Sequence, residues 1–188
     1  TAFDALMSFQ RETEALAQVA GRLGWDQETV MPRGSAEQRG EEMGAMEGIL
    51  HARRTDPRVG EWLATANAPD DVGARAVELI GRAFDRTARV PAALAAELAR
   101  TTSVSQGIWA EARANNDVAH FLPTLKRVVD LEREKAAALA QGGDLYDALL
   151  EDYEPGTTSA SLAAMFDEMR PRLVALREGH RGGERGLE

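Results

Sequence analysis

The chain has 188 residues, with 31 Asp and Glu against 22 Lys and Arg, three His and no Cys, which gives a net charge of −9. Without Cys, a disulfide scaffold, a thiol nucleophile and a Cys-type zinc finger are excluded. The excess of acid disfavours nucleic acid as a partner, because phosphate binding needs clustered Lys and Arg. No apolar run approaches the roughly 20 residues of a membrane span, and the polar first segment is unlike a signal peptide. We therefore expect a soluble cytoplasmic protein.

The composition predicts an all-α fold. Alanine occurs 33 times, whereas Val and Ile together occur 14 times. Ala, Leu, Glu and Arg favour helices, and strands need the β-branched residues that are scarce here. We expect seven or eight helices with short loops, in a single helical domain over residues 1–178. The Gly-rich residues 179–188 are predicted to be a disordered tail or an artificial chain end.

Apolar residues at helical spacing place the expected helices in chain order. The predicted ranges are approximately 2–23, 35–54, 57–66, 71–89, 92–114, 118–140, 145–153 and 159–177. The first helix is expected to weaken at Gly21 and Gly24. A turn from Trp25 to Pro32 should follow, since a proline disfavours the helical conformation for the residue before it.

Three helix starts carry recognisable capping residues. Ser35 with Gln38 three positions later has the pattern of a capping box. Asp56 precedes Pro57, which combines an N-cap with proline at the first helical position. Asp117 is the expected N-cap of the helix that follows it.

The histidines give no metal site of a known pattern. A zinc peptidase helix needs two His four residues apart with a Glu between them, whereas His51, His120 and His180 are widely separated. A ferritin-like di-iron bundle needs paired Glu-x-x-His motifs. The nearest match is the single run from Asp117 to His120, where the acid is better explained as an N-cap. We predict no metal ligand in this chain.

Other kinds of chemistry are equally poorly supported. The sequence has no Gly-x-Ser-x-Gly elbow, no P-loop and no dinucleotide-binding glycine motif. Acid clusters such as Glu41 with Glu42 are expected to be solvated helix faces. The residues alone therefore predict no catalytic residue.

Two features are open to a structural and a functional interpretation. Gly40, Gly44 and Gly48 repeat every four residues, although each helical Gly costs roughly 1 kcal/mol relative to Ala. The repeat is explained by close helix packing, either inside the chain or at a subunit interface, or by compositional drift. The Trp25–Asp26–Gln27 run is explained by a core plug with capping acids, or by part of a substrate cleft.

Three stretches of this chain resemble one known family. They are Leu23–Pro32 (LGWDQETVMP), Trp109–Asp117 (WAEARANND) with Phe121 and Pro123 after it, and Tyr146–Gly156 (YDALLEDYEPG). In this order they resemble the N-terminal part of the carboxypeptidase Taq family of metallocarboxypeptidases. The resemblance extends over nearly all of the chain, to about Leu176.

The resemblance implies a function that the residues alone do not. Members of the family are larger helical enzymes, commonly homodimers. They hold zinc or another divalent metal on a His-Glu-x-x-His helix and remove C-terminal amino acids from peptides. That motif is missing from this sequence. We expect an N-terminal helical cap that contains no catalytic or metal-binding residue, binds no catalytic metal and is inactive alone.

The resemblance also suggests residues of the cap that could line the peptide cleft. These candidates are Trp25, Asp26, Gln27, Tyr146 and Tyr153. The alternative interpretation is a stand-alone helical interaction or regulatory module without catalysis. A reading frame that continues into His-Glu-x-x-His would favour the enzyme, and a natural stop near Glu188 would favour the module.

Overall fold

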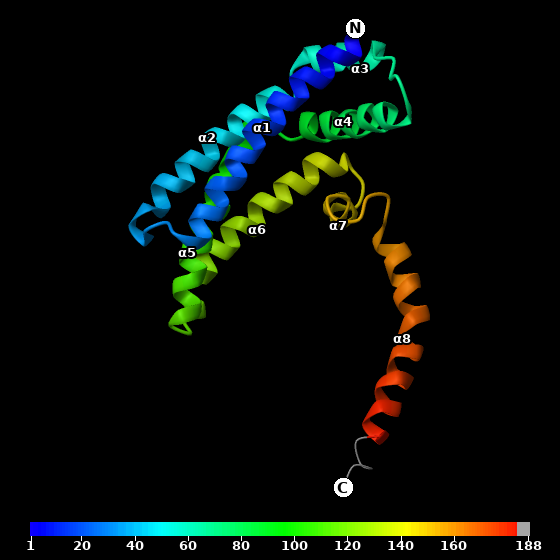
Figure 1. Ribbon diagram of the computed structural model, residues 1–188. Coiled ribbons are helices and arrows are strands. Elements are labelled where there is room, and N and C mark those ends of the chain that lie inside the picture. Colours follow the sequence, from blue (N-terminus) through cyan, green and yellow to red (C-terminus); the bar gives the residue numbers. More distant parts are fainter. Residues whose placement is uncertain (184–188) are drawn as a thin grey trace. The chain divides into compact units, whose positions relative to one another are not determined.

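The computed structural model describes residues 1–183. Those residues form α-helices and one 3₁₀ turn, with no strand among them (Figure 1). The all-α prediction is therefore confirmed. The chain divides into two compact units, Thr1–Leu139 and Ala140–Glu188, a division that the prediction of one domain over residues 1–178 did not include.

Unit 1 contains six α-helices and a 3₁₀ turn, each beginning or ending at a recognisable signal. Asp70 caps one helix by accepting the Gly73 N–H at 2.7 Å, and Asp117 accepts the His120 N–H at 3.0 Å. Both contacts satisfy an amide that the helix itself leaves unpaired. The elements are α1 (Ala2–Thr29), η1 (Arg33–Ser35), α2 (Ala36–Arg54), α3 (Pro57–Thr65), α4 (Asp71–Arg89), α5 (Ala92–Ala114) and α6 (Val118–Ala140).

Helix α2 is the centre of unit 1. It packs along α5 over its length and also contacts α1 and α4, while α3 packs on α1 and α4. Figure 1 shows α1 and α2 running side by side. Few apolar side chains of the described residues are buried, and they come from several helices. They are Leu6, Leu50, Val59, Ala112, Leu131, Ala136 and Leu139.

Two polar contacts connect separate elements of unit 1. The buried His51 of α2 donates from Nε2 to the Val90 carbonyl, at 2.7 Å, just before α5 begins. Arg127 of α6 lies 3.2 Å from the carboxylate of Glu97 on α5. Because His51 is buried, an unmet hydrogen bond there would be costly.

Unit 2 consists of α7 (Leu145–Leu150), a turn and α8 (Ser159–Gly183). Asp144 caps α7 by accepting the Asp147 N–H at 2.9 Å. The carboxylate of Asp147 in turn accepts the N–H of Ser159 at 2.7 Å, which connects the start of α8 to α7. Acidic side chains in this unit therefore act as local backbone acceptors.

Several predicted boundaries were wrong. Helix α1 continues to Thr29, so the predicted turn at Trp25 is helical. Ser35 makes no side-chain capping bond, because it ends the 3₁₀ turn that leads into α2 and its backbone (φ −96°, ψ 5°) is not the extended one typical of an N-cap. Helix α7 ends at Leu150 and α8 continues through Gly183, whereas a disordered tail was predicted from residue 179. Residues 184–188 of that predicted tail lie outside the described residues.

Within residues 1–183, no helix combines the length and the hydropathy that crossing a membrane requires.

Candidate functional site

The end of α1 holds three of the predicted cleft residues, and they differ in accessibility. The Trp25 side chain is 64% exposed. Asp26 and Gln27 instead contact other helices of unit 1 through their side chains. Trp25 is therefore not buried in the core of unit 1, whereas its two neighbours contact α2 and α5.

Arg39 connects α2 to the end of α1. Its side chain is 10% exposed, and Nη2 lies 2.6 Å from the Asp26 carboxylate. Nε donates to Glu42 at 2.9 Å, and Nη1 donates to the Leu23 carbonyl. The hydrogen bond to Asp26, together with that to Glu42, raises the pKa of Arg39, against the opposing effect of burial. A guanidinium held in this way stays charged and takes no part in proton transfer.

Gln27 fixes α1 against α5 by two hydrogen bonds to one residue. Its Nε2 donates to the Ser103 carbonyl at 2.7 Å, and its Oε1 accepts from the Ser103 hydroxyl at 2.7 Å. Ser103 is buried, so both partners satisfy polar groups that water does not reach. Gln27 is thus a packing residue of unit 1.

The glycine repeat on α2 separates into two kinds of position. A Cβ at Gly40 would lie 2.7 Å from Val104 Cγ2, and a Cβ at Gly44 would lie 3.3 Å from the Ala96 carbonyl oxygen, both on α5. A Cβ at Gly48 would meet nothing within 4 Å. Close packing therefore explains Gly40 and Gly44 but not Gly48.

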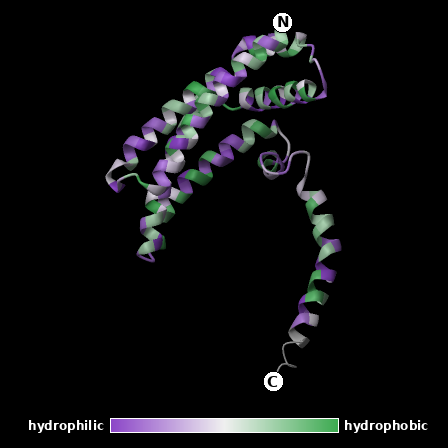
Figure 2. Ribbon diagram, viewed as in Figure 1, coloured by the Kyte–Doolittle hydropathy of each residue, from purple (hydrophilic) through white to green (hydrophobic). Residues whose placement is uncertain are grey.

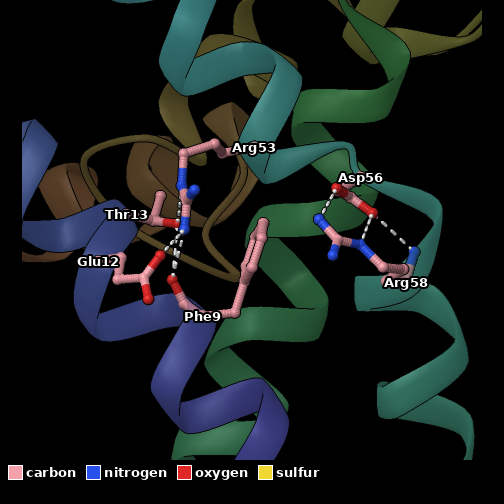
Figure 3. A network of polar contacts seen from close by, with 6 residues as sticks. All are labelled: Phe9, Glu12, Thr13, Arg53, Asp56 and Arg58. Atoms are coloured by element: carbon pink, nitrogen blue, oxygen red, sulfur yellow. Dashed lines mark hydrogen bonds and ion pairs between the residues drawn. The ribbon is translucent and has the colours of Figure 1, made fainter.

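A second arginine cluster joins the end of α2 to α1 (Figure 3). Arg53 Nε donates to the Thr13 hydroxyl at 3.0 Å, Nη2 donates to the Phe9 carbonyl at 3.1 Å and also lies 3.1 Å from Glu12. The guanidinium lies 4.0 Å from the centre of the Phe9 ring, a cation–π distance. No sequence pattern indicated this cluster, since Arg53 lies 40 or more residues from its partners on α1.

Asp56 and Arg58 form an ion pair at the start of α3, also shown in Figure 3. Arg58 Nε donates to Asp56 Oδ1 at 3.0 Å and Nη2 donates to Oδ2 at 2.7 Å. The backbone N–H of Arg58 adds a capping bond to Asp56 Oδ1 at 2.9 Å. These hydrogen bonds lower the pKa of Asp56 to about 2. The carboxylate is therefore ionised at neutral pH and acts as a cap, as predicted.

A small hollow of about 220 Å³ lies where α5 turns into α6. The Arg113 guanidinium lies 5.7 Å from the Trp109 ring centre, and Asp117 is already engaged as the N-cap of α6. The lining residues are Trp109, Ala112, Arg113, Asn116, Asp117, Val118 and Phe121. This mostly apolar hollow has no pair of groups placed for acid–base or nucleophilic work.

The two predicted cleft tyrosines belong to unit 2. Tyr146 is 63% exposed on α7, and Tyr153 is 83% exposed in the turn after it. The turn is stabilised by Glu151, whose carboxylate accepts the Gly156 N–H at 2.7 Å. Both phenol groups are therefore accessible.

Among residues 1–183, no group of three or more His, Asp or Glu side chains is arranged to hold a metal ion. The residues described here therefore do not fit a resident catalytic metal, and no chemical step is assigned to them.

Comparison with known proteins identifies the family. A family model described as carboxypeptidase Taq (M32) metallopeptidase matches residues 5–185. The chain belongs to this family. The M32 chain is 40% identical to thermostable carboxypeptidase 1 of Thermus thermophilus over 190 residues, an alignment that covers 93% of this chain and 37% of that relative. Carboxypeptidase 1 of Bacillus subtilis is 26% identical over 178 residues, with 93% and 35% covered.

Solved structures support the same relationship. The crystal structure of BsuCP, 25% identical, matches with a TM-score of 0.76 over 90% of the M32 chain and 34% of its own. Trypanosoma cruzi metallocarboxypeptidase 1, 24% identical, shares the fold with a TM-score of 0.76 over 100% of this chain and 39% of its own. The M32 chain thus spans a little over a third of the length of these relatives, in their N-terminal portion.

Proposed function

We propose that this chain is the N-terminal helical part of a zinc-dependent carboxypeptidase that removes C-terminal amino acids from peptides. The observation that carries the proposal is the M32 family match over residues 5–185. The chain contains no His-Glu-x-x-His motif. The metal, which in such enzymes polarises a water molecule for attack on the peptide bond, would be held by residues outside this chain.

The proposed role of these helices is to cover one side of the peptide cleft. The exposed ring of Trp25 at the end of α1 and the exposed rings of Tyr146 and Tyr153 in unit 2 are accessible to a peptide. Asp26 and Gln27 would act indirectly, because their contacts to Arg39 and Ser103 hold the end of α1 in place. We further propose a cytoplasmic location and a homodimeric enzyme, on the strength of the family resemblance.

Two measurements on the 188-residue chain test the proposal. After purification in zinc-containing buffer and dialysis, metal analysis should find far less than one zinc per chain, and a blocked dipeptide should not be hydrolysed. Stoichiometric zinc together with hydrolysis would overturn the proposal that the catalytic metal is held by residues outside this chain. An enzyme that carries the continuation found in the relatives should show both properties.

The role of the exposed tryptophan is tested in that longer enzyme. Trp25→Ala should raise KM for a peptide with little change in kcat, because a contact made equally in the ground and transition states affects binding alone. Val19→Ala is the matched control, since Val19 is also exposed on α1 at 39%. Equal KM values for the wild type and the Trp25 variant would show that Trp25 does not contact the peptide in the cleft. A reading frame that stops near Glu188 would instead favour a stand-alone helical module.

A further inference from the structure

Helix α8 carries an apolar stripe with the spacing of a coiled-coil seam. The stripe residues follow one another at intervals of four, three, four and three, and they are Leu162, Phe166, Met169, Leu173 and Leu176. This alternation keeps all five on one side of the helix. Figure 2 shows apolar residues in green along α8.

From Phe166 onward the stripe is open to solvent. Every residue from Ala163 to His180 is exposed, including Phe166 at 49%, Leu173 at 55% and Leu176 at 72%. A helix of this kind gains little stability from its own hydrogen bonds, and Pro171 inside it supplies no N–H. The stripe therefore has the features of a surface that a partner helix covers.

The charges of α8 are sorted about the stripe. At about 100° per residue, Arg170 and Arg177 border the stripe on one side and Arg172 borders it on the other. The acidic residues of the helix lie on the opposite face, and they are Asp167, Glu168 and Glu178. Arg172 contacts Glu168 at 3.8 Å, and both side chains are largely exposed. A partner on the stripe would therefore meet arginine on both flanks.

This arrangement disfavours a second copy of α8 as the partner. In a parallel pair, the flanking positions that meet across the seam are five residues apart, which puts Arg172 opposite Arg177 of the other copy. In an antiparallel pair, each flank meets the same flank of the other helix, again with arginine against arginine. Like charges placed together in this way oppose pairing.

We propose that the α8 stripe binds a helix with an apolar ridge bordered by Asp or Glu, supplied by the part of the longer carboxypeptidase that follows this chain. The proposal rests on the proposed function for the source of the helix. Two observations support it: the arginine flanks, and the relatives' length, of which this chain spans 37% in the Thermus thermophilus protein. The arginines would pair with the carboxylates while the apolar stripe is buried.

Binding to the α8 stripe is tested on the 188-residue chain with two synthetic helical peptides. Both carry Leu at the seam positions, and one has Glu and the other Lys at the flanking positions. The Glu peptide should bind at least tenfold more tightly by isothermal titration, with an affinity that falls as salt rises. Binding should also increase the helix signal in circular dichroism. Equal binding of both peptides, or binding of neither, would overturn the proposal.

Substitutions in α8 identify the groups responsible. Arg170→Glu, Arg172→Glu and Arg177→Glu together should reverse the preference to the Lys peptide. Leu173→Asp should abolish binding of both. The matched control is Asp167→Arg with Glu178→Arg on the far face. This double variant should still prefer the Glu peptide, as the wild type does. Loss of that preference in the control would refute the assignment of the flanks.

The source of the partner helix is tested separately. In the enzyme that carries the continuation, Leu173→Asp should lower the midpoint of thermal unfolding by at least about 4 °C, because a charge would enter a buried seam. An unchanged midpoint would overturn the internal source. A dimer of the 188-residue chain that Leu173→Asp dissociates in sedimentation would assign the stripe to a second copy and overturn the proposal. The hydrolysis test is independent of these outcomes, so failure of the proposed function can be recognised by itself.

Discussion

Replacing Gly40 by alanine tests whether α2 and α5 pack as closely as the structure indicates. Alanine is favoured over glycine inside a helix by roughly 1 kcal/mol. At Gly40 the new methyl group would lie 2.7 Å from Val104 Cγ2, and overpacking of this kind costs about 1–3 kcal/mol. The expected net change is a loss of about 0–2 kcal/mol in the free energy of unfolding.

Gly48→Ala is the control on the same helix. A methyl group there meets nothing within 4 Å, so only the helix preference acts and the chain should gain about 1 kcal/mol. The two variants should thus differ by about 1–3 kcal/mol. In a thermal melt followed by far-UV circular dichroism, each kcal/mol shifts the midpoint by about 2–4 °C for a chain of this size.

Val104→Ala completes the experiment. With Cγ2 removed, Gly40→Ala should cost less than it does in the wild-type background, so the double variant should be more stable than the sum of the single changes predicts. Urea unfolding of the four proteins gives this coupling directly. If Gly40→Ala raised stability as much as Gly48→Ala, the close approach of α2 and α5 would be refuted.

Substitutions at three further positions of unit 1 have expected outcomes. Arg39→Met should lower the free energy of unfolding by about 1–3 kcal/mol, because its carboxylate partners and a backbone carbonyl lose their donor. Arg39→Lys should cost less, and the comparison is made by urea unfolding. Gln27→Glu should cost about 1–3 kcal/mol, since a carboxylate oxygen would then face the Ser103 carbonyl; an unchanged free energy of unfolding would argue against the pairing. The Asp56 pKa is depressed from 3.8 to about 2 by Arg58, so its contribution should be complete above pH 4 and lost as the pH falls toward 2. Asp56→Asn, which can still cap, should remove that part of the pH dependence of the urea midpoint.

The sequence predicted helices well where local signals set both ends. Helix α6 begins after the Asp117 cap and ends before the Gly142–Gly143 pair, and its predicted range matches Val118–Ala140. The prediction failed at the end of α1, where Gly21 and Gly24 suggested a break. The helix continues because Asp26 and Gln27 contact Arg39 and Ser103, the latter 76 residues away. Such a contact has no signature in a local pattern.

The candidate site was less accessible to sequence reasoning than the fold. The family resemblance directed attention to the end of α1, but side-chain contacts decide which residues there are available. Trp25 is exposed, while Gln27, two residues on, is committed to α5. A single sequence cannot separate these roles, because both residue types occur in clefts and in packing contacts. The arginine clusters escaped detection for the same reason.

The packing of α2 against α5 has a consequence for the order of events during synthesis. About 60 residues separate the end of α2 at Arg54 from the end of α5 at Ala114. At roughly 5–20 residues per second, the ribosome needs about 3–12 s to add them. During that interval the nascent α1 and α2 have no α5 to cover Gly40 and Gly44 or to pair with Gln27. Unit 1 therefore assembles late, and its first two helices spend seconds as an unfinished surface on the growing chain.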